Sequence, residues 1–164
     1  MTVSDDAWWE LLHELDDPDH MEFPAIYDHT EVRARFNKVV AKLDTAFGCR
    51  CHVDRNIQDA SFHGDIGVPA THTAGGERIT IRISNFGNLA VYSPENIRSY
   101  TDAEKRQLLP AEDLDRIEDT LTGLDYRVVP EDLLNTRYNG RSDLANYYPS
   151  DQPPTWFTRF FDYL

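Results

Sequence analysis

The stretch Ile79-Thr80-Ile81-Arg82-Ile83-Ser84, followed by Asn85-Phe86-Gly87-Asn88 and then Leu89-Ala90-Val91, decides the fold. Apolar and polar residues alternate with a period of two, which is the period of side chains on a β-strand. The Asn- and Gly-containing tetrapeptide between the two runs is typical of a tight turn. The stretch therefore predicts a β-hairpin with one buried face.

The same alternation extends the sheet on both sides of this hairpin. Residues 50–54 and 61–63 predict two paired strands upstream, and residues 126–129 resemble a last short strand. We therefore expect a sheet of about four to five strands, formed by residues 50–92 together with 126–129.

Three segments follow the helical period instead. Ser4 is a good N-cap for a helix over residues 4–16, and Thr30 and Gly48 bracket a second helix over 30–47. A third helix is predicted over 110–122, because proline favours the first turn of a helix. Helices that flank a run of amphipathic strands predict an α+β fold: an antiparallel β-sheet with helices packed mainly on one face.

The length of 164 residues suits a single domain spanning residues 1–164, and no repeat or linker interrupts it. Residues 130–154 are expected to be irregular in structure but packed against the rest of the domain. The aromatic segment 154–164 is too apolar for a loose tail, so we expect it to seal the core. An alternative is that these aromatics dock onto a second molecule as an oligomerisation module.

The charge of the chain limits its partners. The sequence has 29 acidic residues against 16 Lys and Arg, a formal charge of −13. This excess opposes binding to nucleic acid or to anionic lipid. No apolar run is long enough for a membrane span, and no signal peptide is recognisable, so we expect a cytoplasmic protein. Cys49 and Cys51 are too close in sequence for an unstrained bridge and predict two reduced thiols.

The placement of the acids is uneven. Residues 1–32 contain 10 acidic residues and no Lys or Arg. This distribution predicts an anionic face that attracts a basic protein partner, although a solvated surface that favours solubility explains it as well. In the first predicted helix, Trp8, Leu11, Leu12 and Leu15 form an apolar stripe. Trp9 lies near the edge of this stripe and resembles an interface anchor. The predicted partner-binding residues are Asp5, Asp6, Trp9, Glu10, Glu14, Asp16, Asp17, Asp19 and Glu22. A second candidate patch consists of Glu112, Asp113, Asp115, Glu118 and Asp119.

A repeated His-x-Asp motif supports a competing hypothesis. His52 and Asp54, and again His63 and Asp65, are predicted on the polar side of neighbouring strands. Two imidazoles and a carboxylate suit a metal ion or acid and base chemistry. The ordinary alternative is a water-facing sheet surface, which needs only the period of two. No serine-nucleophile motif, zinc-ligand spacing or Gly-rich phosphate loop is present, so we expect no catalytic residue, bound metal or cofactor.

The C-terminal third of the sequence resembles a group of small bacterial proteins. The relevant residues are Val129-Pro130-Glu131-Asp132-Leu133-Leu134, the turn Tyr138-Asn139-Gly140, and the ending Trp156-Phe157-Thr158-Arg159-Phe160-Phe161. They resemble immunity proteins encoded as partners of polymorphic or contact-dependent bacterial toxins. This resemblance implies an inhibitor that covers a cognate toxin domain, often a nuclease or another basic enzyme. It assigns no role to any individual residue.

Overall fold

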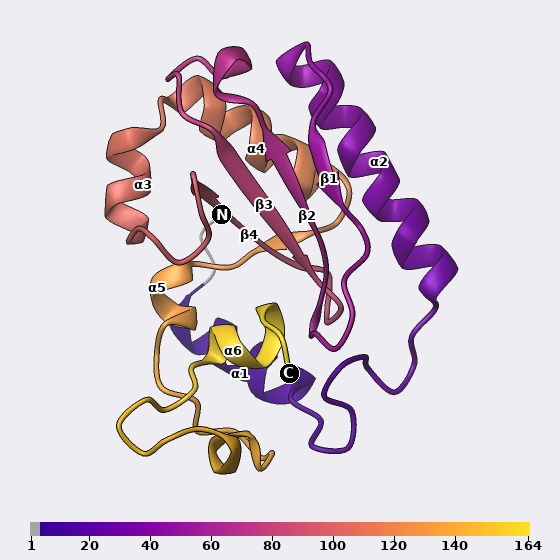
Figure 1. Cartoon of the computed structure of the whole chain (residues 1–164), viewed down its shortest axis with the longest axis vertical. Coiled ribbons are helices and arrows are strands. Elements are labelled where there is room, and N and C mark those ends of the chain that lie inside the picture. Colours follow the sequence, from indigo (N-terminus) through magenta and orange to yellow (C-terminus); the bar gives the residue numbers. More distant parts are fainter. Residues whose placement is uncertain (1–3) are drawn as a thin grey trace.

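The computed structural model describes residues 4–164 and has the predicted α+β architecture. Figure 1 shows a central sheet with helices on both sides of it. The helices are α1 (Asp5–Leu15), α2 (His29–Phe47), α3 (Asp102–Leu108), α4 (Ala111–Gly123), α5 (Glu131–Leu134) and α6 (Trp156–Phe161), and two short 3-10 helices are η1 (Ala70–His72) and η2 (Leu144–Tyr147). The strands are β1 (His52–Asp54), β2 (Phe62–Val68), β3 (Ile79–Ser84), β4 (Leu89–Pro94) and β5 (Arg127–Val128).

The five strands lie in the sheet in sequence order, from β1 to β5. The first four are antiparallel neighbours, and the predicted hairpin pairs Ile81 with Tyr92 and Ile83 with Ala90. Only β5 runs parallel to its neighbour β4. A parallel pair needs a long crossover connection, and the chain makes it through α3 and α4.

The hairpin is buried on both faces, so the prediction of one buried face was wrong. Ile81 and Ile83 lie in a cluster beneath α2 and α4, together with Ala90 and Tyr92. Leu89 and Val91 alternate with these residues and therefore point to the opposite face, where a second cluster lies. Helices consequently pack on both sides of the sheet. The second cluster includes buried side chains of α1, α5 and α6, the helices that gather at the lower end of the molecule in Figure 1.

The helix boundaries follow local capping. Ser4 caps α1 as predicted, and Gly48, with φ 63°, ends α2. The N-cap of α2 is Asp28 and not Thr30, because the Asp28 side chain accepts a hydrogen bond from the Glu31 amide. Helix α3 was not predicted, although its capping box of Thr101 and Glu104 is a recognisable signal.

The C-terminal aromatics close the second cluster. Trp156, Phe157, Phe160 and Phe161 form α6 with at most 1% of each side chain exposed. These four aromatics therefore pack inside the molecule. Tyr163 and Leu164, at the end of the same segment, are 52% and 48% exposed. The oligomerisation hypothesis thus stays a prediction that rests on these last two residues.

Candidate partner-binding face

Helix α1 has one face fixed in the core. The Ser4 hydroxyl accepts a hydrogen bond from the Ala7 amide over 3.3 Å, which satisfies a free donor at the start of the helix. Trp8 and Leu12 then enter the second cluster with 6% and 0% of their side chains exposed. Because these anchors are one helical turn apart, they determine which side of α1 faces solvent.

The outer side of α1 is acidic. Asp5, Asp6, Glu10 and Glu14 are all exposed, and no ion pair within residues 4–164 involves them. Asp6, Glu10 and Glu14 follow one another at intervals of four residues and so form one row along the helix. Like charges at this spacing destabilise a helix by about 0.2–0.5 kcal/mol per pair. The helix dipole stabilises Asp6 in the first turn, but no Lys, Arg or His side chain within residues 4–164 forms an ion pair with the row.

Trp9 lies beside this row and is half-buried, not fully exposed. Its ring packs edge-on against Trp156, with 5.8 Å between the ring centroids, and also contacts His13. The indole is thus held in one orientation while part of it remains accessible. A rigid aromatic side chain next to exposed charges is typical of an interface hot spot.

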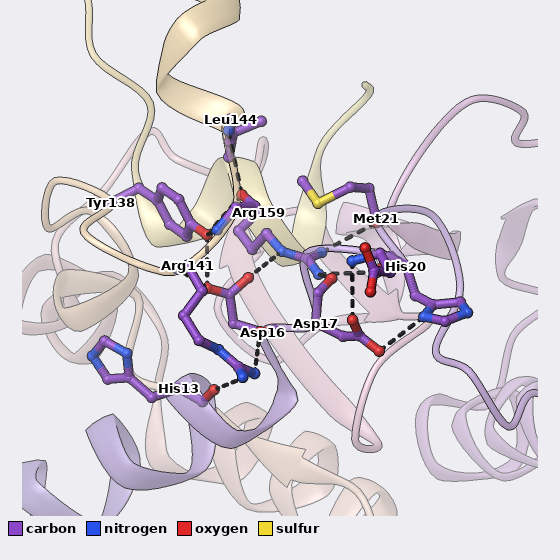
Figure 2. Close-up of polar contacts among 11 residues, drawn as sticks. His13, Asp16, Asp17, His20, Met21, Tyr138, Arg141, Leu144 and Arg159 are labelled. Carbon is purple, nitrogen blue, oxygen red and sulfur yellow. Dashed lines mark hydrogen bonds and ion pairs between the residues drawn. The ribbon is translucent and has the colours of Figure 1, made fainter.

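Asp16 does not belong to the surface, contrary to prediction. Its side chain is fully buried, and one carboxylate oxygen accepts a hydrogen bond from Arg159 Nε over 2.7 Å. The other oxygen accepts from the Tyr138 hydroxyl over 2.6 Å and from the Arg141 amide over 2.9 Å (Figure 2). Asp16 therefore ties the end of α1 to the C-terminal part of the chain.

The guanidinium group of Arg159 is likewise held by several hydrogen bonds. It donates to the backbone carbonyls of Asp17, His20 and Met21 over 3.0–3.1 Å, and Figure 2 shows these contacts converging on its guanidinium group. The guanidinium also lies 4.7 Å from the centre of the Phe86 ring. A buried arginine whose donors meet a carboxylate and several carbonyls fixes the backbone that follows α1.

The remaining predicted residues of this face differ in exposure. Asp17 is half-buried, and hydrogen bonds from the Asp19 amide and the His20 ring lower the pKa of its carboxyl group. Asp19 is exposed, whereas Glu22 is half-buried and its backbone carbonyl accepts from Asn85. The exposed acids of the predicted face are therefore Asp5, Asp6, Glu10, Glu14 and Asp19. We call these five residues the acidic face.

Two exposed apolar side chains were not predicted. In the loop between α1 and α2, Ile26 has 97% of its side chain exposed, and Phe23 has 36%. Exposed apolar side chains beside charges are typical of protein-binding surfaces. The signal in the sequence was the presence of two large apolar residues around Pro24 in a segment with no strand or helix period.

The second acidic patch is mostly engaged within the chain. Asp113 is fully buried and accepts hydrogen bonds from the Ala74 and Gly75 amides. Glu112 pairs with Arg116, and Glu118 accepts from the Tyr92 hydroxyl. Asp115, Glu118 and Asp119 are exposed and form no ion pair within residues 4–164, and among these three Glu118 accepts the hydrogen bond from Tyr92.

The two His-x-Asp motifs do not converge. Across the strands, His52 pairs with Gly67 and Asp54 with Asp65, and a β-bulge between Phe62 and Gly64 shifts the register. The bulge turns His63 to the opposite face of the sheet, where its ring packs against Phe36 with 5.0 Å between centroids. The prediction that both histidines share the polar side was therefore wrong.

His63 is instead a core residue with an unsatisfied atom. Its side chain is 7% exposed, and its Nε2 has no hydrogen-bond partner within residues 4–164. Burial, with the nearby positive groups of His29, Arg33 and Arg55, lowers the pKa of His63 to about 4. In the described part of the chain, no group of three or more His, Cys, Asp or Glu side chains is arranged to hold a metal ion.

The two cysteines are neighbouring thiols, with 4.0 Å between Cys49 Sγ and Cys51 Sγ. Burial and the nearby Asp44 carboxylate raise the pKa of the Cys51 thiol, which makes it a poor nucleophile. No helix in residues 4–164 combines the length and apolar character required to cross a bilayer.

Comparisons with known proteins add no relative: no protein-family model, no curated protein and no solved structure matches this chain.

Proposed function

We propose that this protein is a non-enzymatic inhibitor, an immunity protein that binds and neutralises a cognate bacterial toxin domain in the cytoplasm. The observation that carries the proposal is the row of exposed acids on α1, which has no ion pair within the described chain. A basic partner would supply the missing countercharge. Matched potentials of this kind raise association rates and penalise wrong partners.

The support beneath the acidic face favours binding without rearrangement. Trp8 and Leu12 anchor α1, and the Asp16–Arg159 pair fixes the chain that follows it. A surface that is ordered before binding loses less conformational entropy when the complex forms. We therefore expect the acidic face to bind as a rigid body, with Trp9 as an apolar contact beside the charges.

The proposal is tested by capture followed by neutralisation. The purified protein is used as bait against an extract of its native organism at low and high salt, and retained proteins are identified by mass spectrometry. We expect one basic protein that is retained at low salt and weakened by high salt, because exposed charge pairs are screened. When expressed alone in a test bacterium that protein should arrest growth, and co-expression of the present chain should restore growth.

A matched pair of variants locates the binding face. Glu10→Lys/Glu14→Lys reverses two exposed acids four residues apart on α1, and Asp115→Lys/Asp119→Lys makes the same change on α4. The first variant should lose both capture and growth rescue, and the second should keep them. A captured protein that is not toxic would refute the immunity function, and a stronger effect of the α4 variant would place the interface elsewhere.

A further inference from the structure

The sheet carries a polar pocket of about 400 Å³ on the face turned away from α2. Its floor comes from the solvent side of β1, β2 and β3, where His52, Gly67 and Thr80 are cross-strand neighbours. The turn after β4 and the C-terminal residues form its walls. A volume of this size accommodates a small molecule.

Gly67 makes the floor of this pocket hollow. A Cβ atom added at Gly67 would come within 3.1 Å of Arg78 Nη2, so the guanidinium of Arg78 lies directly above the bare backbone. Any larger residue would occupy this space. The absence of a side chain at Gly67 thus leaves room for the cationic group of Arg78 on the floor of the pocket.

The arginines around the pocket differ in the hydrogen bonds and ion pairs that their guanidinium groups already form with the protein. Arg82 donates to both oxygens of Asp65 over 2.8–2.9 Å and to the Phe161 carbonyl, so its donors are used. Arg98 lies 3.7 Å from Asp162 in a partly exposed pair. The Arg78 side chain makes no hydrogen bond or ion pair within residues 4–164. Of the three guanidinium groups that line the pocket, that of Arg78 is therefore the one without a carboxylate partner in the described residues.

Carboxylates also line the pocket. Asp54 and Asp65 are direct cross-strand neighbours, and Asp65 is neutralised by Arg82, while no ion pair within residues 4–164 involves Asp54. Asp54 lies two residues along β1 from His52, which corresponds to about 7 Å. Asp162 is paired with Arg98. Within the described residues, the pocket therefore offers one guanidinium without an ion pair, that of Arg78, and one carboxylate without an ion pair, that of Asp54.

We propose that this pocket binds a small polar ligand through an oxyanion, a carboxylate or phosphate group, held beside Gly67 by Arg78. Guanidinium groups suit such oxyanions because their paired N–H donors match the oxygen spacing. Asp54 accepts a hydrogen-bond donor of the same ligand and disfavours a second anionic group. This site is separate from the acidic face and does not depend on the proposed function.

Nuclear magnetic resonance titration of the full chain tests the site with two probes, inorganic phosphate and acetate. Saturable shifts of the Gly67 amide and the Arg98 amide at concentrations up to about 50 mM are expected for a weak fragment of the true ligand. A response to phosphate alone indicates a phosphate-bearing ligand, and a response to acetate alone indicates a carboxylate. No saturable shift at Gly67 with either probe overturns the proposal.

Two variants and one control make the result specific. Arg78→Gln should weaken binding of the effective probe about tenfold, because a charged donor is lost. Gly67→Ala should reduce binding by filling the floor, and its unchanged melting temperature would show that the fold persists. Lys42→Gln removes an exposed charge on α2, on the other side of the sheet, and should change nothing. Equal binding by the wild type and Arg78→Gln would refute the role of this arginine and the site with it.

Discussion

Asp16 and Arg159 stand 143 residues apart in the sequence, yet Arg159 Nε donates to Asp16 Oδ1 over 2.7 Å with both side chains fully buried. The pair joins the end of α1 to α6 and encloses the loop that leads towards α2 (Figure 2). It has a direct consequence for stability. A buried charge that loses its partner is far more costly than an exposed one, since the low-dielectric interior cannot solvate it.

We expect Asp16→Asn to destabilise the protein by about 3–5 kcal/mol, because the Arg159 charge would remain buried without a counterion. Urea unfolding at pH 7 measures the change. Asp19→Asn is the matched control, since Asp19 is an exposed acid a few residues away, and it should shift the unfolding free energy by less than about 0.5 kcal/mol. Equal midpoints for the two variants would contradict the structural role of Asp16.

The same cluster makes a glycine obligatory. A Cβ atom at Gly140 would overlap the Asp16 carboxylate and come within 2.5 Å of Tyr138, whereas one at Gly123 would meet nothing within 4 Å. Gly140→Ala should therefore lower the melting temperature strongly. Gly123→Ala should leave it unchanged or raise it slightly, since alanine is the better helix former. Thermal unfolding of both variants side by side checks this, and a tolerated Gly140→Ala would show that the cluster relaxes easily.

The lowered pKa of His63 predicts that the folded protein loses stability in mild acid. Its pKa is lowered from an ordinary 6.5 to about 4 in the folded protein, so the unfolded state binds the proton more readily. The contribution of the neutral His63 side chain to the free energy of unfolding is complete above pH 6.5 and declines as the pH falls towards 4. Between pH 7 and pH 5 the decline amounts to about 2 kcal/mol.

The variant His63→Phe isolates this effect, because it keeps an aromatic ring against Phe36 and removes the titrating group. Unfolding free energies measured at pH 7, 6 and 5 should fall for the wild type and stay nearly level for His63→Phe. Parallel pH profiles for the two proteins would show that other groups are responsible.

The exposed loop beside α1 predicts an apolar contribution to partner binding. Ile26 has 97% of its side chain exposed, so Ile26→Ser should not alter the melting temperature. If a captured partner covers this side chain, the dissociation constant should rise about tenfold, the value expected for one buried aliphatic group. Calorimetric titration measures it. Leu108→Ser is the control: it changes an exposed apolar residue on α3 and should leave the affinity unaltered. Equal affinities for wild type and Ile26→Ser would exclude the loop from the interface.

Local physics explains which parts of the fold were predictable. The period of apolar residues along α2, the Gly48 stop and the alternation along β3 are each determined by neighbours in the chain. Helix α3 was missed because its seven mostly polar residues have almost no apolar period, although its capping box was present.

The candidate sites depended on contacts that no local pattern contains. Asp16 is the same residue type as the exposed Asp19, three positions later, and its contacts with the distant Tyr138, Arg141 and Arg159 decide that it is buried. His63 has the same motif as His52, but a one-residue bulge sends it to the opposite face.

The sequence by itself thus determined the α+β class, the three longest helices, most strands and the excess of acids near the N-terminus, because short-range periodicity and composition are properties of the chain alone. Only the tertiary structure decided which acids are surface and which are core, that the hairpin is covered on both faces, and that Arg78 lies over Gly67. Burial and ion pairing are set by residues far apart in the sequence, and their positions become defined only when the chain has folded.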